Sequence, residues 1–189
     1  SRRQRQMCIR DRGSFYYFFE SKADLAVAAL KAHWENARPA VEKAFDPRLE
    51  PLLRLLSYHQ LILHQQQCCV TQRSCTLGCP YVVLGSELCQ RDEKILTQVR
   101  AILTELREYF SQAVHDLYLA QGRGIDNADS MAACLFNMFE GALTQARVYN
   151  DLELLNSLPL GVIRLLGFPD SVLTQANKAL PDISIYAAA

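Results

Sequence analysis

Cysteine is the residue type with which this 189-residue chain is best equipped for chemistry. The segment over 79–89 is expected to form a short helix, so the thiol of Cys79 would lie at its N-terminus. The positive end of a helix dipole favours a thiolate, which lowers the pKa of a thiol and raises its reactivity. Cys79 is therefore a candidate sensor of oxidants or electrophiles, and Cys75 or Cys89 could form a disulfide with it.

Other interpretations of the cysteines remain open. Cys79 and Cys89 can be small buried packing residues, which is the commoner state of a free cysteine. A metal site would require four side chains to converge: His64, Cys68, Cys75 and Cys79. Their spacing contains no C-x-x-C pair, so we predict no metal site. The seven cysteines form an odd set in a chain with no evident secretory signal, which argues against a disulfide framework.

Familiar enzyme motifs are missing from the sequence. We find no G-x-S-x-G, no H-E-x-x-H, no phosphate-binding loop and no outstanding pair of carboxylates. We therefore predict no enzymatic activity and no cofactor. A thiol-dependent enzyme centred on Cys79 is the less favoured alternative.

Composition and charge narrow the class of protein further. Half of the residues are hydrophobic and 21% are charged, which is ordinary for a globular protein. No stretch approaches the roughly 18 apolar residues of a membrane span, and we expect a cytoplasmic protein. Five of the 20 Lys and Arg residues, but only one of the 20 Asp and Glu residues, lie in the first twelve positions. Attraction to phosphate would come from this end, unless the arginines form a solvated tail.

Cap and turn signals divide the chain into helices, and no strand is convincing. The sequence SKAD at 21–24 has the form of a capping box and predicts a helix over 22–45, kinked at Pro39 and ended by Pro47. The following segments are expected in this order: a helix within 48–67, a loop over 68–78, a short helix over 79–89, and an amphipathic helix from residue 91 or 92 to a glycine cap at 121–124.

The last two predicted helices, over 131–148 and 152–167, are apolar on nearly every side. Residues 126–129 cap the first, and Pro159 bends the second. Such helices need partners on two sides, and a second subunit can supply one of them, although a pair enclosed within a monomer is the alternative. We favour a homodimer, with an interface formed by Leu135, Met138, Gly141, Ala142, Gln145, Leu155, Val162 and Leu166.

The stretch RGSFYYFFESKADL, residues 12–25, places five aromatic residues in a row before the first helix. Five consecutive side chains cover every direction around a short helix, so some must be exposed. Exposed tyrosines between Arg12 and Lys22 suit a surface that meets a sugar-phosphate backbone. The alternative is a hydrophobic cluster that joins the N-terminus to the body, with Phe15 and Phe19 facing inward.

The sequence GSFYYFFESKADL resembles the end of the helix-turn-helix in TetR/AcrR-family transcriptional regulators, where the recognition helix leads into the next helix. The likeness extends from Gly13 to about Gly167, because a long helix with a proline is followed by helices that end in an apolar pair. It implies an all-α, TetR-like fold: the remnant of a helix-turn-helix followed by a helical effector-binding and dimerisation domain. In the family's pattern the residues that approach DNA match Gly13, Ser14, Tyr16, Tyr17 and Lys22.

The chain departs from the family's pattern at two points. Phe18 stands where many members carry a histidine, and only twelve residues stand where the family places two further helices. We expect a truncated fragment with a foreign leader, rather than an ancestral loss of the domain. The resulting division is as follows: leader 1–12, recognition and connecting helices 13–45, effector-binding and dimerisation domain 46–168, and C-terminal tail 169–189.

The resemblance also implies an effector pocket between the helices of the larger domain, whose occupation changes the spacing of the two recognition helices. The candidate pocket and sensor residues are Trp34, Tyr58, His59, Cys75, Cys79, Tyr81, Cys89, Phe110, Asn137 and Glu140. Asn137 and Glu140 share one helix face with Thr144 and Arg147, and this stripe can equally face solvent. His59 lies in an apolar stripe and can be a satisfied core histidine.

These observations together predict a homodimeric repressor whose complete form binds a double-stranded DNA operator. A small-molecule effector, or modification of a cysteine by an electrophile or oxidant, would release it. The main alternative is a helical ligand-binding or dimerisation module without DNA contact. For the truncated chain alone we expect little specific DNA affinity, because a groove helix without its supporting pair is not held rigidly.

Overall fold

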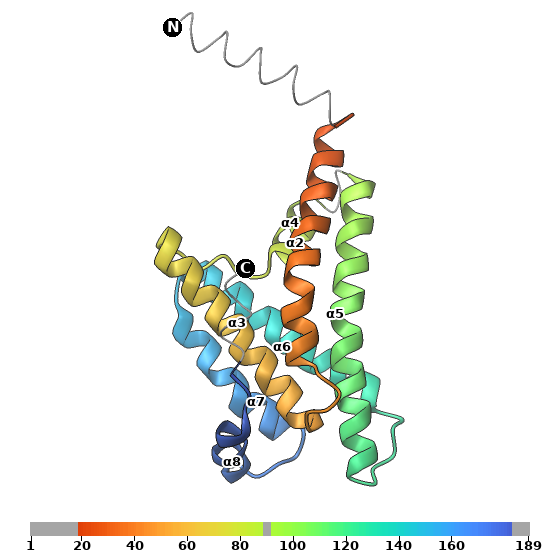
Figure 1. Ribbon diagram of the computed structural model, residues 1–189, viewed down its shortest axis with the longest axis vertical. Helices are drawn as coiled ribbons and strands as arrows, with labels where there is room; N and C mark the ends of the chain where they lie inside the picture. The colour runs from red at the N-terminus through yellow and green to blue at the C-terminus, as the bar shows by residue number, and fades with distance from the viewer. Residues whose placement is uncertain (1–18, 89–91, 183–189) are drawn as a thin grey trace, which may run out of the picture.

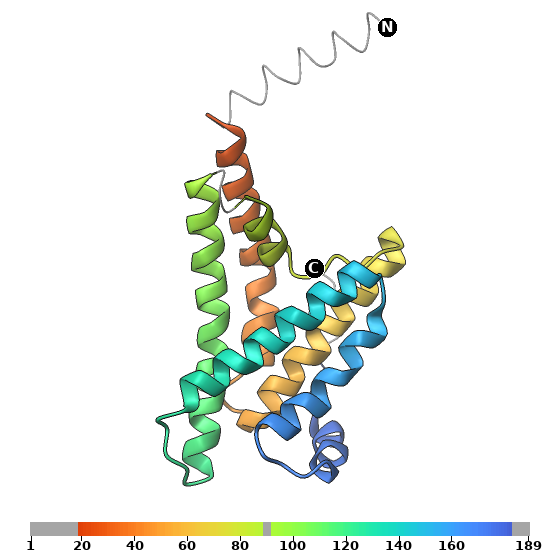
Figure 2. The ribbon, with the colours of Figure 1, turned by 180° about the vertical axis from the view of Figure 1, so that it is seen from behind.

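The computed structural model describes residues 19–88 and 92–182, and these residues form helices and no strand (Figures 1 and 2). The elements in chain order are α2 (Lys22–Ala44), α3 (Pro51–Arg73), α4 (Pro80–Leu88), α5 (Glu93–Ala120), α6 (Ala128–Tyr149), the 3₁₀ helix η1 (Leu152–Ser157), α7 (Leu158–Leu165) and α8 (Ser171–Ala179). The all-α fold class expected from the sequence is confirmed.

The first helix begins and ends where its sequence signals indicate. Ser21 caps α2, because its hydroxyl accepts a hydrogen bond from the backbone N–H of Asp24 at 3.2 Å. Pro39 lies inside the helix, which nevertheless continues to Ala44. The long helix α5 is likewise capped by Asp92 and ends in a Schellman motif, in which Gly122 has a φ of +65°.

The third predicted segment is wrong in part. Residues 68–73 belong to α3 and not to a loop, because no helix breaker interrupts this run of residues. The helix ends only at Ser74, whose backbone adopts the left-handed region and whose N–H bonds to the carbonyl of Val70. Cys68 and Cys69 are consequently helical, and only residues 74–79 connect α3 to α4.

The C-terminal part contains three further differences from the predicted elements. Asn127 caps α6 without a side-chain hydrogen bond, and the carboxylate of Asp129 is hydrogen-bonded to Ser111 and His115 of α5. The break in the last predicted helix precedes Pro159, which lies in the first turn of α7, where a missing N–H costs nothing. Finally, α8 lies inside the segment expected to be a tail and packs against α3 and α7.

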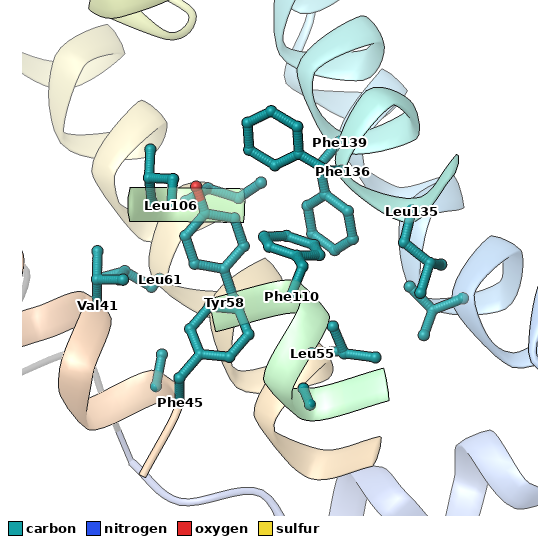
Figure 3. Close-up of a cluster of buried hydrophobic side chains, with 14 of the residues drawn as sticks. Val41, Phe45, Leu55, Tyr58, Leu61, Leu106, Phe110, Leu135, Phe136 and Phe139 are labelled. Carbon is teal, nitrogen blue, oxygen red and sulfur yellow. The ribbon is translucent and has the colours of Figure 1, made fainter. Parts of the chain in front are cut away.

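The centre of the molecule is an aromatic cluster held between four helices (Figure 3). Phe110 of α5 is fully buried, and its ring centroid lies 5.3 to 5.5 Å from those of Phe45, Tyr58, Phe136 and Phe139. The edge-to-face and tilted arrangements of these rings are the favourable ones for aromatic pairs. Because α5 packs against α2, α3, α4 and α6, this cluster joins the long helices into one core.

Half of the residues predicted for a dimer interface belong to this interior instead. Leu135, Leu155, Val162 and Leu166 are each at most 2% exposed within the single chain, because α6 and α7 pack on α3, α5 and each other. They are therefore core residues, and the prediction for these four is wrong.

Candidate functional site

A pocket of about 540 Å³ opens between the helices above the aromatic core. Its walls come from α2, α3, α4 and the 74–79 connection, with single residues from α5 and α6. Val41, Tyr58, Leu61 and Leu106 line it, and these side chains form one edge of the core cluster in Figure 3. The volume and the largely apolar lining are those of a site for a small organic molecule.

The connection between α3 and α4 is held in place by Gln66, which is 6% exposed. Its carbonyl oxygen accepts hydrogen bonds from the backbone N–H groups of Leu77 and Gly78, both at 3.0 Å, and its amide donates to the Gly78 carbonyl. Gly78 has a φ of +66°, and a Cβ there would lie 3.1 Å from the carbonyl oxygen of Leu143. This position therefore requires glycine, and the peptide passes close over α6.

A second set of hydrogen bonds ties the same connection to the end of α6. The Thr76 hydroxyl donates to the carbonyl of Ala146 at 2.7 Å, and the Thr76 N–H donates to the side chain of Asn150 at 2.9 Å. Arg147 donates to the carbonyl of Leu77 at 2.9 Å. The connection is thus fixed on both sides, which places Cys79 at the wall of the pocket.

Cys79 precedes α4, as the sequence predicts, but its thiol is not activated. The side chain is only 8% exposed, and it hydrogen-bonds to the carboxyl group of Glu140 on α6. Burial, together with the charge of Glu140, raises the pKa of the Cys79 thiol far above its ordinary value. The predicted lowering of this pKa by the helix dipole is therefore wrong, because desolvation opposes it and dominates.

Glu140 is the one member of the predicted polar stripe that turns inward, with 9% of its surface exposed. Burial raises the pKa of its carboxyl group to about 7, and the hydrogen bond from Cys79 opposes this shift only in part. Its Oε2 atom has no hydrogen-bond partner among the described residues. The other members of the stripe, Asn137, Thr144 and Arg147, are exposed.

Polar contacts at the pocket rim join α2 to α4 and α5. The Nδ1 atom of His33 and the hydroxyl of Tyr81 are hydrogen-bonded at 2.7 Å. The indole N–H of Trp34 donates to Glu105 at 2.8 Å, and Arg38 forms an ion pair with the same carboxylate. Burial lowers the pKa of His33 and raises that of Tyr81, so both side chains are neutral near pH 7.

The structure brings together only part of the residues predicted for the pocket. Trp34, Tyr58, Cys79 and Tyr81 line it. Phe110 is in the core, with none of its surface exposed. His59 is also a core residue, because it is 7% exposed and its Nε2–H donates to the carbonyl of Leu155 at 3.0 Å.

The remaining predicted sensor residues lie apart from the pocket or cannot be placed. Cys75 is half-buried in the 74–79 connection and does not line the pocket, and Asn137 is on the surface of α6. Cys89 lies outside the described residues. Sequence reasoning missed several polar lining residues: His33, Asn36, Gln65, Gln66, Cys68, Cys69 and Gln72. Cys68, Cys69 and Gln72 could have been found from the absence of a helix breaker before Arg73. The helix α3 that results extends along the pocket as far as these residues.

The exposed face of α6 and α7 carries the remaining residues predicted for a dimer interface. Gln145 is exposed, Met138 and Ala142 are half-buried, and the position of Gly141 borders open space. Three apolar side chains near the ends of these helices are strongly exposed: Val148 (73%), Tyr149 (71%) and Leu165 (43%). This surface, which we call the α6–α7 face, carries exposed apolar side chains that no other part of the described structure covers.

Of the residues predicted to approach DNA, only Lys22 is described. It is exposed in the first turn of α2. The start of this helix is tied to the start of α5, because Lys94 forms an ion pair with Asp24 at 2.8 Å. Gly13, Ser14, Tyr16 and Tyr17 lie outside the described residues.

Residues 19–88 and 92–182 contain neither a metal site nor a membrane-spanning helix. No group of three or more His, Cys, Asp or Glu side chains in these ranges could hold a metal ion. The Sγ atom of Cys68 lies 3.6 Å from Nε2 of His64, but this pair has no third ligand among the described residues. None of the helices described is both long and apolar enough to cross a membrane.

Comparisons with known proteins place this chain in a regulatory family. Residues 58–158 match the family described as "Transcriptional regulator LmrA/YxaF-like, C-terminal domain". The HTH-type transcriptional repressor NemR of Escherichia coli K12 is 27% identical over 173 residues, which cover 84% of this chain and 78% of NemR. NemR of E. coli O6:H1 gives the same values.

A solved structure with the same fold is the regulatory protein TetR from Rhodobacter sphaeroides. It superposes with a TM-score of 0.68 and 22% sequence identity, covering 81% of this chain and 80% of that protein. The family match covers more than half of the chain and includes α3 after Tyr58, α4, α5, α6 and η1. The chain therefore belongs to the TetR family of transcriptional regulators, with a C-terminal domain of the LmrA/YxaF-like type.

Proposed function

We propose that this chain is part of a homodimeric repressor that leaves its DNA operator when a small-molecule effector occupies the pocket between α2, α3 and α4. The observation that carries the proposal is the composition of the pocket wall. His33, Trp34 and Val41 of α2 line the pocket, and α2 begins at Lys22, within the motif at 13–25 that resembles the end of a recognition helix and the start of the next helix. A ligand in contact with these residues can therefore bias the position of the DNA-binding end.

The contacts at the pocket rim connect α4 to α2, so a ligand that changes these contacts can shift the position of α2. Tyr81 bonds to His33, and its ring packs edge-to-face on Trp34 at a centroid distance of 6.0 Å. A ligand that displaces Tyr81 would break the link between α4 and α2 while leaving the ion pair of Arg38 and Glu105 in place. Repression and release are then two positions of α2 whose populations the effector shifts by its different affinity for them.

The proposed dimer uses the α6–α7 face. Its exposed residues Val148, Tyr149 and Leu165 are apolar, and Gly141 leaves room for the close approach of a second backbone. Family repressors of this kind act as dimers, and a two-fold symmetric dimer suits a palindromic operator. We propose that Lys22, together with Gly13, Ser14, Tyr16 and Tyr17, approaches the DNA.

We propose reversible binding of the effector and not capture by Cys79. The buried thiol, with its raised pKa, forms little thiolate near pH 7. Cys68 and Cys69 line the pocket and are half-buried, so modification of the pocket by an electrophile would involve these residues before Cys79.

A binding experiment with the native gene product tests the proposed function. Duplexes that bind it are first selected from a random DNA pool, and the best one is used in gel-shift titrations. We expect a palindromic duplex bound by two chains, and release of the DNA by a compound that quenches the fluorescence of Trp34, the single tryptophan in the chain. Failure to select any DNA sequence would favour a ligand-binding module without DNA contact.

A further inference from the structure

Glu140 is a buried acid whose hydrogen bonding is incomplete. One part of its carboxyl group is hydrogen-bonded to the Cys79 thiol, but Oε2 has no partner among the described residues. Leaving a buried carboxylate oxygen without a donor is costly, and such atoms are rare in folded proteins. The position therefore requires an explanation outside the packing of the chain itself.

The location of Glu140 connects it to the pocket. On α6 it precedes Leu143 by three residues, so the two side chains share one face of the helix. Leu143 lines the pocket, as do Cys79, which is bonded to Glu140, and Tyr58, whose hydroxyl pKa is raised by burial and by the charge of Glu140. The carboxyl group thus lies directly behind the wall formed by Cys79, Tyr58 and Leu143.

No basic side chain of the described structure compensates this acid. The lining of the pocket contains no Lys and no Arg among residues 19–88 and 92–182. His33 is the one titratable base in the lining, and burial lowers its pKa. Arg147 is exposed and directed to the carbonyl of Leu77. An ionised Glu140 therefore gives the pocket a negative field.

The aromatic walls favour the same kind of ligand. Trp34, Tyr58 and Tyr81 line the pocket from α2, α3 and α4, and the rings of Trp34 and Tyr81 meet edge-to-face. The negative face of an aromatic ring attracts a cation, most strongly where water is excluded. The amides of Gln65, Gln66 and Gln72 add only neutral polar groups.

We infer that the effector is an organic monocation: a protonated amine whose N–H donates to Oε2 of Glu140, attached to an apolar body that contacts Trp34, Tyr58 and Tyr81. This inference rests on the proposed function, since it names the chemical class of the effector for the same pocket.

Three probes with related skeletons and different charges test the inference. They are 4-phenylbutylamine, 4-phenylbutanol and 5-phenylpentanoate, each titrated into the native gene product near pH 8. Binding is measured by calorimetry and by the quenching of Trp34, which reports on the pocket because this side chain lines it. We expect the amine to bind at least about tenfold more tightly than the alcohol, and the carboxylate to bind most weakly.

Two variants identify the group responsible. Glu140→Gln keeps the shape of the side chain and removes its charge, so the preference for the amine over the alcohol should disappear. Glu108→Gln removes an acid from the exposed surface of α5 and should retain the preference. Circular dichroism confirms that each variant is folded, and the comparison of the three probes in the unmodified protein does not depend on either variant.

The outcomes separate the inference from the proposed function. Equal quenching of Trp34 by amine and alcohol, with equal affinities, would overturn the cationic class and leave the pocket as an effector site. A preference for the amine that persists in Glu140→Gln would likewise overturn the role of Glu140. The absence of saturable quenching by all three probes would overturn the inference together with the pocket on which the proposed function rests.

Discussion

The aromatic core and the pocket are neighbouring regions that share Tyr58 but are built differently. On the core side, the ring of Tyr58 packs against Phe45, Phe110 and Phe139 at centroid distances of 5.3 to 5.6 Å. On the pocket side the same residue borders about 540 Å³ of open volume. The core is filled by apolar side chains from four helices, whereas the pocket is kept open by a connection that polar groups of Gln66 and Thr76 hold in place.

This difference shows that opposite surfaces of the same helices serve two purposes. One surface stabilises the fold, and the other can bind a ligand. The core side of α3 and α5 supplies close packing, which leaves no room for a ligand. The pocket side contains the buried polar groups of Gln66 and Glu140, which closer packing alone would not favour. Substitutions on the core side should therefore mainly change stability, whereas substitutions on the pocket side should mainly change ligand binding.

The largest effect is expected from the replacement of Phe110 by alanine. The side chain is fully buried at the centre of the cluster, so its removal should lower the free energy of unfolding by about 3–5 kcal/mol. The control Leu119→Ala, at a side chain 65% exposed near the end of α5, should change it by less than about 0.5 kcal/mol. Chemical denaturation measures both, and similar losses in the two variants would contradict the description of the core.

The second effect concerns the pH dependence of stability. Burial raises the pKa of Glu140 from 4.5 to about 7, so the folded protein retains a proton that the unfolded chain has lost. This contribution is fully present below pH 4.5 and is lost as the pH rises through 7, which amounts to about 3 kcal/mol. Glu140→Gln should therefore show a smaller loss of stability between these pH values than the unmodified protein.

The difference between the pH profiles of the unmodified protein and of Glu140→Gln reports on Glu140 alone. Cys79, Tyr58 and Tyr81 face the same region, but the pKa of each is raised, so they do not titrate in this range. His33, whose pKa is lowered, titrates in both proteins and cancels in the difference. Identical pH profiles for the variant and the unmodified protein would show that Glu140 is not buried as described.

The third test introduces the same substitution on both sides. Ala113 is 1% exposed in the core, and Ala40 is 4% exposed but lines the pocket. Ala113→Leu should destabilise the protein by about 1–3 kcal/mol through overpacking. Ala40→Leu extends into open volume and should cost clearly less, while it weakens the binding of pocket ligands. Thermal unfolding and the quenching of Trp34 measure the two effects, and equal destabilisation would contradict the presence of an open pocket.

Modification or substitution of the cysteines is expected to affect the fold least. The quantity measured here is the rate at which each thiol reacts. Cys134 is exposed, whereas Cys79 is 8% exposed with a strongly raised pKa. Titration of the native protein with a disulfide reagent near pH 7 should modify Cys134 rapidly and Cys79 only slowly. Cys79→Ser should consequently leave the number of fast-reacting thiols unchanged, and loss of a fast thiol in this variant would restore Cys79 as a sensor.

Helix positions could be predicted from the sequence wherever a local signal sets them. The capping box at Ser21 and the glycine at Gly122 fix the ends of α2 and α5 through backbone hydrogen bonds to nearby residues. The extension of α3 to Arg73 was missed because the apolar periodicity of that helix is weak. Helix α8 was missed although its apolar residues recur at helical spacing, because it is only nine residues long. The stability of both segments comes from tertiary contacts, such as those between α8 and α7.

The pocket could be predicted only in part, because a cavity depends on which helix faces meet. Aromatic residues such as Trp34 and Tyr81 are conspicuous in the sequence, and both line it. Glu140 and Arg147 share one stripe in the sequence, yet only Glu140 is buried, since the contact of α6 with Cys79 decides the difference. The pKa of Cys79 was predicted in the wrong direction for the same reason: the helix start is local information and desolvation is not.

The account depends most directly on the claim that occupation of the pocket and occupation of DNA exclude each other. The measurement is a titration of the DNA-bound native gene product with 4-phenylbutylamine, following both the quenching of Trp34 and the fluorescence anisotropy of a labelled duplex. We predict that the anisotropy falls to the value of free DNA as the quenching of Trp34 saturates. Complete quenching of Trp34 with unchanged anisotropy would show that a ligand fills the pocket without releasing the DNA, and would contradict the account.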